Sequence, residues 1–159
     1  MLHIVRRTTL AVATAGAIAL SPMALSHLDD KEMQQSYRQS FFAMLAMNFG
    51  PIASTVKGEI PWDQARMQGW ADDLAKIGTL DVMRGFAPGS DKGTTRAKPE
   101  IWDNMDDFKS KMDDMTAATA AMQTAVASGD KAAVGKQLGA LGDTCKACHD
   151  EYKSKDYLY

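Results

Sequence analysis

Two cysteines and a histidine lie together near the C-terminus, in the run Cys145-Lys146-Ala147-Cys148-His149. The two thiols are three residues apart, and an imidazole follows directly after the second. With this spacing each sulfur can form a thioether with one vinyl group of a haem, and the histidine can become an axial ligand of its iron. We therefore predict that Cys145 and Cys148 attach one haem c covalently and that His149 binds the iron.

A zinc site, a redox-active thiol pair and a disulfide could use the same thiols. Structural zinc takes four ligands and usually pairs two such clusters, whereas the only other histidine after residue 26 is His27. A thioredoxin-type pair should follow a strand in a βαβ unit, but these cysteines lie in a helical pattern. A Cys145–Cys148 disulfide would be a strained loop inside a helix. Haem attachment is favoured, and the zinc and redox interpretations stay open.

The thiols belong to the inward face of a predicted helix that follows Asp130, a suitable N-cap. Apolar residues recur there every three or four positions, which is the spacing of one helix face. They are Val134, Leu138, Leu141, Cys145, Cys148 and Tyr152. A haem attached to this face would be buried among other helices.

Three earlier segments are also helical in pattern. One lies between Pro99-Glu100 and Ser128-Gly129, and its seam alternates steps of four and three, which is typical of a left-handed bundle helix. Its members are Ile101, Met105, Phe108, Met112, Met115, Thr119, Met122 and Val126. Two more helices are expected over residues of about 30–48 and 61–78.

No segment alternates polar and apolar residues for long enough to predict a strand. Four helices with connections at residues 49–60, 79–98 and 127–130 predict an all-α fold, an antiparallel four-helix bundle with covalently attached haem c. The connection at 79–98 is long for a loop without function. Its apolar residues Met83 and Phe86 could fold back onto the cofactor or plug the open end of the bundle.

Residues 1–26 are predicted to be a cleaved signal peptide. The pair Arg6-Arg7 precedes an uncharged apolar run at 10–20, and small residues follow at 24–26. The run is too short for a stable membrane anchor. We therefore expect general secretion to the periplasm, without membrane insertion, of a single domain at residues 27–159.

Charge and cysteine usage narrow the function classes. Removal of the signal peptide lowers Lys+Arg from 18 to 16 and leaves 20 Asp+Glu, so the net charge becomes about −4. An acidic protein is a poor partner for nucleic acid. Because the haem motif uses both cysteines, no disulfide framework remains, and packing and haem must hold the fold.

Six short segments resemble the cytochrome c′ family, and together they extend over essentially the whole chain after the signal peptide. They are Tyr37-Arg38-Gln39, Asn48-Phe49-Gly50-Pro51, Val56-Lys57-Gly58, Phe86 with Pro88-Gly89, Lys98-Pro99-Glu100-Ile101-Trp102, and Cys145 to Lys153. The resemblance implies a periplasmic four-helix bundle, usually a homodimer. It also implies haem c with a five-coordinate, high-spin iron that binds NO and CO on a crowded distal face.

The resemblance also implies roles for single residues. His149 is the expected proximal ligand, and Lys153 lies one helical turn further on, beside the proximal pocket. Arg38 and Gln39 match residues near the haem propionates. A solvated surface charge remains the alternative for Lys153 and an ordinary surface arginine for Arg38, although a buried guanidinium would need an anion such as a propionate.

Phe42 matches the distal residue that packs over the iron in this family. Relatives with methionine there have a six-coordinate low-spin haem and act as electron carriers, whereas phenylalanine has no lone pair to give to iron. Met83 in the long connection is the main rival ligand, and relatives have an aromatic residue at that position.

Two functions from different classes follow. The first is a haem protein that binds NO or CO at an open sixth site and can transfer one electron. The second is a low-spin electron carrier of the cytochrome c-556 type, which would dock an unidentified redox partner. An enzyme such as a peroxidase would need a distal acid–base pair, and apart from Arg38 nothing indicates one, so no enzyme activity is predicted.

A homodimer through the first two helices is also expected. The first helix has apolar residues on two sides, and a helix of this kind usually has more than one neighbour. Phe41 and Met44 remain for a partner if Phe42 and Leu45 face the haem.

Overall fold

The computed structural model describes residues 32–158 and confirms the predicted all-α bundle. Its four long helices are α1 (Met33–Val56), α2 (Gln64–Gly78), α4 (Met105–Ala127) and α5 (Lys131–Tyr152). The 3-10 helix η2 (Val82–Phe86) and the one-turn helix α3 (Glu100–Asp103) lie between α2 and α4. The predicted signal peptide and the start expected for the first helix lie outside the described residues.

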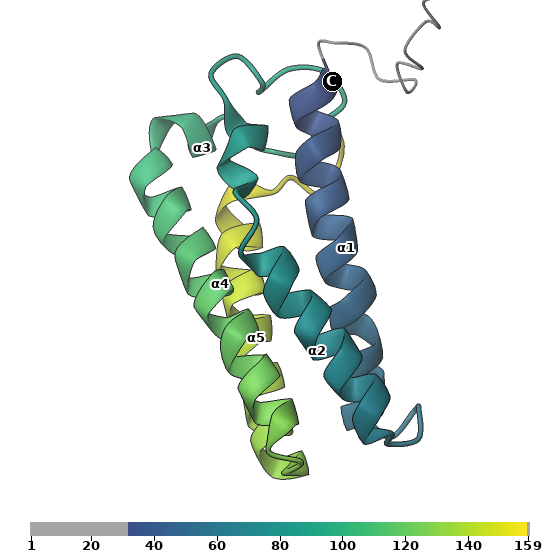
Figure 1. Ribbon diagram of the computed structural model, residues 1–159. Helices are drawn as coiled ribbons and strands as arrows, with labels where there is room; N and C mark the ends of the chain where they lie inside the picture. Colours follow the sequence, from purple (N-terminus) through teal and green to yellow (C-terminus); the bar gives the residue numbers. More distant parts are fainter. Residues whose placement is uncertain (1–31, 159) are drawn as a thin grey trace, which may run out of the picture.

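The four long helices run alternately up and down, so that each is antiparallel to the next long helix in the chain (Figure 1). α4 packs against both α2 and α5, and α1 packs against α2 and η2. The loops after α1 and α4 lie at one end of the bundle, and η2, α3 and the end of the chain lie at the other. Among the described residues, no helix has the length and hydropathy needed to span a bilayer.

The first helix is longer than predicted, because α1 continues through Pro51 to Val56. Proline lacks the N–H that would bond to the carbonyl of Met47, so its presence inside a helix has a cost. Burial of Ile52 and Thr55 on the next turn offsets that cost, and the Thr55 hydroxyl donates to the Pro51 carbonyl over 2.8 Å. The predicted connection at 49–60 was therefore wrong in its first eight residues.

One predicted helix start and the continuity of another predicted helix also need correction. The helix expected from residue 61 begins at Gln64, because Asp63 is its N-cap and accepts a hydrogen bond from the Arg66 N–H over 3.0 Å. The helix whose start was predicted at Pro99-Glu100 does begin at Glu100, but it is interrupted at Asn104, which separates α3 from α4. The Asn104 side-chain amide donates to the Glu100 carbonyl over 3.1 Å, and such local bonds compete with helix continuation.

The predicted core faces are confirmed on α4 and α5. From Phe108 to Val126 the seam of α4 is buried, and the Thr119 hydroxyl donates to the Thr116 carbonyl over 2.7 Å. Gly78 allows α2 to approach here, since a Cβ at that position would lie 2.4 Å from the Thr119 hydroxyl. On α5 the buried positions include Cys148 and Tyr152, so the face that carries the thiols is turned inward.

Candidate functional site

Cys145 and Cys148 lie one helical turn apart on α5 and line the same cavity. Both thiols are free, and Cys148 is only 7% exposed. Burial raises the pKa of Cys145 and raises that of Cys148 to about 11. Redox-active cysteine pairs need a lowered pKa, so this environment opposes the thioredoxin-type interpretation.

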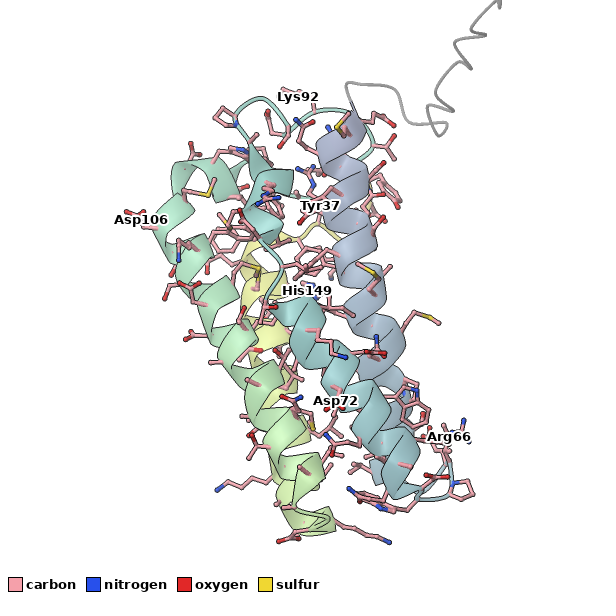
Figure 2. The ribbon with its side chains drawn as sticks, viewed as in Figure 1. Tyr37, Arg66, Asp72, Lys92, Asp106 and His149 are labelled. Atoms are coloured by element: carbon pink, nitrogen blue, oxygen red, sulfur yellow. The ribbon has the colours of Figure 1, made fainter. Side chains whose placement is uncertain are left out.

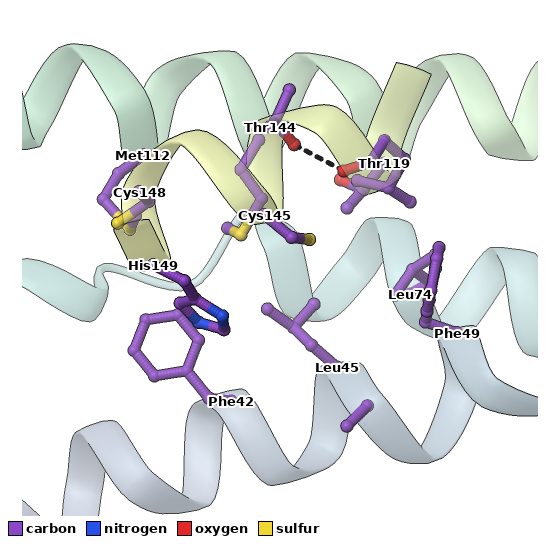
Figure 3. A pocket seen from close by; sticks show the side chains of 13 residues that line it. Phe42, Leu45, Phe49, Leu74, Met112, Thr119, Thr144, Cys145, Cys148 and His149 are labelled. Atoms are coloured by element: carbon purple, nitrogen blue, oxygen red, sulfur yellow. Dashed lines mark hydrogen bonds between the residues drawn. The ribbon is translucent and has the colours of Figure 1, made fainter. Parts of the chain in front are cut away.

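The cavity beside the thiols is apolar and has a volume of about 230 Å³. All four long helices contribute to it, and Figure 3 shows their side chains converging on the two cysteines. Its apolar walls include Leu45, Phe49, Leu74, Met112, Met115 and Leu141. Such a cavity holds an apolar ring system and has few groups that would hold water.

A second cavity of about 430 Å³ is lined by Phe42, Ala46, Cys148 and His149, all of which line the first cavity too. Its wall also contains polar and cationic groups, namely Arg38, Gln39, Arg96, Lys153 and Tyr157. No aspartate or glutamate is among its lining residues. The second cavity therefore favours anionic groups on a ligand whose body extends into the apolar cavity.

His149 lies where the two cavities meet, and the Phe42 ring of α1 lies beside its imidazole (Figure 3). Figure 2 shows His149 nearer to the end of the bundle that holds Tyr37 than to the end that holds Arg66, and its side chain is exposed at the opening of the cavities. Packing around the ring, and then the positive charges of Lys153 and Arg96, lower the pKa of His149. A lowered pKa favours the neutral imidazole, which is the form that binds a metal.

Arg38 is buried, at 3% exposed, so the alternative of an ordinary surface arginine was wrong. Its guanidinium donates to the Gly85 and Ser90 carbonyls, each over 2.9 Å, and to the hydroxyls of Ser90 and Thr95 over 3.1 and 2.5 Å. It also lies over the Phe86 ring, 5.1 Å from its centroid. Burial lowers the pKa of Arg38 to about 10, opposed by Asp91, so it stays charged at neutral pH. Carbonyls and hydroxyls therefore satisfy this guanidinium without an anion.

The other predicted residues are brought to the site with one exception. Gln39 and Lys153 line the second cavity, and Gln39 also donates to the Thr94 carbonyl over 2.8 Å. Phe86 lines this cavity too, which agrees with the expectation that the long connection folds back toward the cofactor. Met83 packs against the core but lines neither cavity.

Sequence reasoning missed Arg96 and Tyr157, which both line the second cavity. Arg96 carries a positive charge just before the segment Lys98-Pro99, and that charge was the only signal available. Tyr157 follows the end of α5, and beyond a helix the helical periodicity does not predict the path of the chain. Both residues reach the site through tertiary contacts.

The residues present fit haem c. A haem has an apolar ring, two vinyl groups and, on the opposite edge, two anionic propionates. The apolar cavity holds both thiols, the cationic cavity holds Arg38, Arg96 and Lys153, and His149 lies between them. For the zinc alternative, no group of three or more His, Cys, Asp or Glu within residues 32–158 is placed to hold a metal ion.

Comparison with known proteins gives a consistent result. The family model described as Cytochrome C′ matches residues 33–153. Cytochrome c′ of Cereibacter sphaeroides is 37% identical over 150 residues, which cover 91% of this chain and 97% of the relative. The cytochrome c′ structure from Shewanella frigidimarina has a TM-score of 0.76 and 35% identity, covering 80% of this chain and 99% of the other.

A further solved structure is the nitric oxide complex of a mutant cytochrome c′ from Alcaligenes xylosoxidans. It has a TM-score of 0.72 and 33% identity, and the match covers 79% of this chain and 97% of the other. The matched length, the bundle and the pair of thiols on α5 agree with one another. The chain therefore belongs to the cytochrome c′ family and carries haem c covalently on its only two cysteines, Cys145 and Cys148.

Proposed function

We propose that this cytochrome is a periplasmic haem protein in which His149 is the single axial ligand from the chain and the iron's other face binds NO and CO. One observation carries the proposal. Phe42, whose side chain has no donor atom, is the aromatic residue that both cavities share with His149. A phenylalanine at this place leaves the sixth coordination position without a ligand from the chain.

Haem c bound here supplies an iron that can change oxidation state by one electron and can bind a neutral diatomic gas. The chain fixes its position through the two thiols of α5 and offers His149 as a neutral imidazole. Arg38, Arg96 and Lys153 supply positive charge for the propionates. These roles account for the cationic side chains that line the second cavity.

Phe42 and the apolar wall select the ligand. The Phe42 ring packs edge-on against Phe41, with 5.2 Å between ring centroids, and Phe41 is almost fully buried. An entering ligand must therefore displace a ring that has a fixed neighbour. The first cavity is almost entirely apolar, so water and anions find few hydrogen-bond partners there. A small neutral gas gives up little solvation free energy when it enters. The nitric oxide complex of the similar Alcaligenes xylosoxidans protein supports this preference.

The alternative is a six-coordinate low-spin electron carrier. It requires a second ligand from the chain, and Met83, the main candidate, lines neither cavity. Met112 does line the first cavity, but Figure 3 places it beside Cys148, whereas Phe42 lies beside His149. A peroxidase-like enzyme is not supported either, because Arg38 donates its hydrogen bonds to the loop.

We also propose a homodimer through α1 and α2. Four apolar side chains on α1, between 36% and 75% exposed, recur at helical spacing: Met33, Tyr37, Met44 and Met47. Exposed apolar stripes of this kind favour association. Phe41 is not available to a partner, contrary to expectation, because it is buried in the core of its own chain.

An absorption spectrum of the full chain, exported together with a haem-attachment system, tests the proposed function. The ferrous protein should be high-spin, and its Soret band should shift when CO or NO is added. A spectrum that is low-spin in both oxidation states would replace the gas-binding function with the electron-carrier alternative.

A further inference from the structure

The chain does not end with α5. After Tyr152 it leaves the helix and pairs with residues 95–98, the segment before α3. Ala97 and Lys153 form an antiparallel bridge, and the Lys98 N–H donates to the Tyr152 carbonyl over 3.0 Å. We name residues 153–158 the C-terminal clasp. Figure 1 shows it crossing from α5 toward α1 at the end of the bundle where η2 lies.

Four hydrogen bonds hold the clasp to Thr95 and Arg96. The Ser154 N–H donates to the Arg96 carbonyl over 2.8 Å, and the Leu158 N–H donates to the Thr95 carbonyl over 3.0 Å. The Arg96 guanidinium donates in return to the Ser154 carbonyl over 2.9 Å and to the Lys155 carbonyl. Each clasp group bonded here belongs to the backbone, so the docking does not depend on the clasp's own side chains.

The segment that holds the clasp is anchored inside the protein. The Thr95 hydroxyl, on a residue only 1% exposed, accepts a hydrogen bond from buried Arg38 on α1 over 2.5 Å. The chain of contacts therefore runs from α1 through Thr95 to the clasp and back to α5. These contacts fix the position of the clasp, two of whose residues line the second cavity.

The clasp places Tyr157 in the wall of the second cavity, together with His149, Lys153 and Arg96. Tyr157 is 61% exposed, so one side of it faces the cavity and the other faces solvent. Arg38, Arg96 and Lys153 make this cavity attractive to anions and polar molecules from solution. An aromatic side chain on the solvent side of this cavity is therefore in a position to limit which molecules reach the haem.

We propose that Tyr157 is a specificity-determining residue, which slows the approach of ligands larger than a diatomic gas to the haem held in the two cavities that His149 lines. This inference rests on the proposed function, because it concerns access to the haem site. A diatomic molecule passes without displacing the tyrosine. A planar ring such as imidazole requires the Tyr157 side chain to move outward. The backbone hydrogen bonds of the neighbouring residues Ser154, Lys155 and Leu158 hold this part of the chain against the bundle, so the side chain must rotate while its backbone stays docked.

The test measures imidazole association with the ferric holoprotein and CO association with the ferrous holoprotein by stopped-flow absorption. Tyr157→Ala should speed imidazole association about tenfold and leave the CO rate within about twofold, since tenfold corresponds to ~1.4 kcal/mol of barrier. Tyr157→Phe keeps the ring and should behave as wild type. Leu158→Ala is the matched control, because Leu158 is in the clasp, keeps its backbone bond and does not line the cavity.

Unchanged imidazole association in Tyr157→Ala would overturn the inference, and so would an equal acceleration of imidazole and CO. Amide hydrogen exchange supplies a reading that does not depend on ligand binding. The Ser154 and Leu158 amides should exchange slowly in wild type and faster in Arg96→Gln, and fast exchange in wild type would exclude a docked clasp. A low-spin wild type that binds no CO would overturn the proposed function and this inference together, whereas unchanged Tyr157→Ala rates in a CO-binding protein would overturn this inference alone.

Discussion

The Arg38 guanidinium and the Thr95 hydroxyl, 57 positions apart in the chain, are joined by a hydrogen bond of 2.5 Å between Nη2 and Oγ1. The same guanidinium bonds the carbonyls of Gly85 and Ser90. A single cation on α1 thus holds the long connection against the bundle at Gly85, Ser90 and Thr95. Buried carbonyls left without donors are costly, so this cation is expected to matter for stability as well as for haem binding.

Replacing Arg38 should release the long connection. Arg38→Leu removes the short guanidinium bonds and leaves the Gly85 carbonyl only the Ser90 hydroxyl at 3.4 Å and the Ser90 carbonyl only the Gln35 amide at 3.5 Å. It should lower the free energy of unfolding by roughly 3 kcal/mol. Denaturant unfolding of the holoprotein measures the change. Gln39→Ala, which removes one exposed hydrogen bond to the Thr94 carbonyl, is the control and should cost under about 1 kcal/mol. Equal losses in the two variants would show that Arg38 does not anchor the connection.

Replacing Phe42 should change ligand access. Phe42→Ala should speed CO association by orders of magnitude. The wild-type barrier includes the cost of displacing a packed aromatic ring, roughly a few kcal/mol, and the variant does not have this cost. Phe42→Met should offer a thioether and convert the haem toward a low-spin spectrum. Flash photolysis and absorption spectra measure both effects. The control is Met44→Ala, on the exposed side of α1, which should have the CO association rate of wild type. If Phe42→Ala also has the wild-type rate, Phe42 does not lie over the iron.

The haem should be required for the fold. In Cys145→Ala/Cys148→Ala the cavities of about 230 and 430 Å³ would lose their covalently held occupant. Without haem the apolar walls of both cavities face water, which opposes folding, so we expect a colourless protein without cooperative thermal unfolding. Circular dichroism during heating measures this, with Lys146→Ala as the control on the exposed side of α5. A colourless but cooperatively folded double variant would contradict a structural role for haem.

Acid should weaken the contact between α4 and α5. The Tyr152 hydroxyl donates to Asp107 over 2.5 Å, and this bond, together with that from Lys111, lowers the pKa of Asp107. A carboxylate with a lowered folded pKa contributes stability above its unfolded pKa and loses it as pH falls through the folded value. Tyr152→Phe should therefore be less stable than wild type near pH 7.

The difference between wild type and Tyr152→Phe should shrink below about pH 4, where aspartate takes up a proton. Denaturant midpoints across this pH range measure it. Asp113→Asn, at an exposed ion pair with Lys109, serves as the control and should show little pH-dependent difference from wild type. A constant gap between wild type and Tyr152→Phe at all pH values would mean that the Asp107 carboxylate is not the linked group.

Association should depend on the exposed stripe of α1. Met44→Glu places a charge in the proposed interface and should shift the protein from dimer to monomer at micromolar concentration in analytical ultracentrifugation. Lys136→Glu, on the exposed side of α5, should leave the dimer intact. If the wild-type protein is already monomeric at this concentration, the exposed stripe of α1 is not a dimer interface.

The sequence by itself determined the cofactor and the class of fold. The thiols at 145 and 148 with His149 are adjacent in the chain, and helix spacing alone turns Cys148 and Tyr152 to one side. Such local patterns can be read without knowing what the helix packs against. The Asp130 cap and the α4 seam followed from the same kind of local information.

Only the tertiary structure decided the details that depend on distant residues. The continuation of α1 through Pro51 follows from the burial of Ile52 against the core, which offsets a local cost. The burial of Arg38 depends on carbonyls from a segment about fifty residues further along the chain. Arg96 and Tyr157 reach the haem cavity because the clasp pairs across the end of the bundle. In each case the deciding energy comes from a partner far away in the chain, and local sequence spacing carries no record of it.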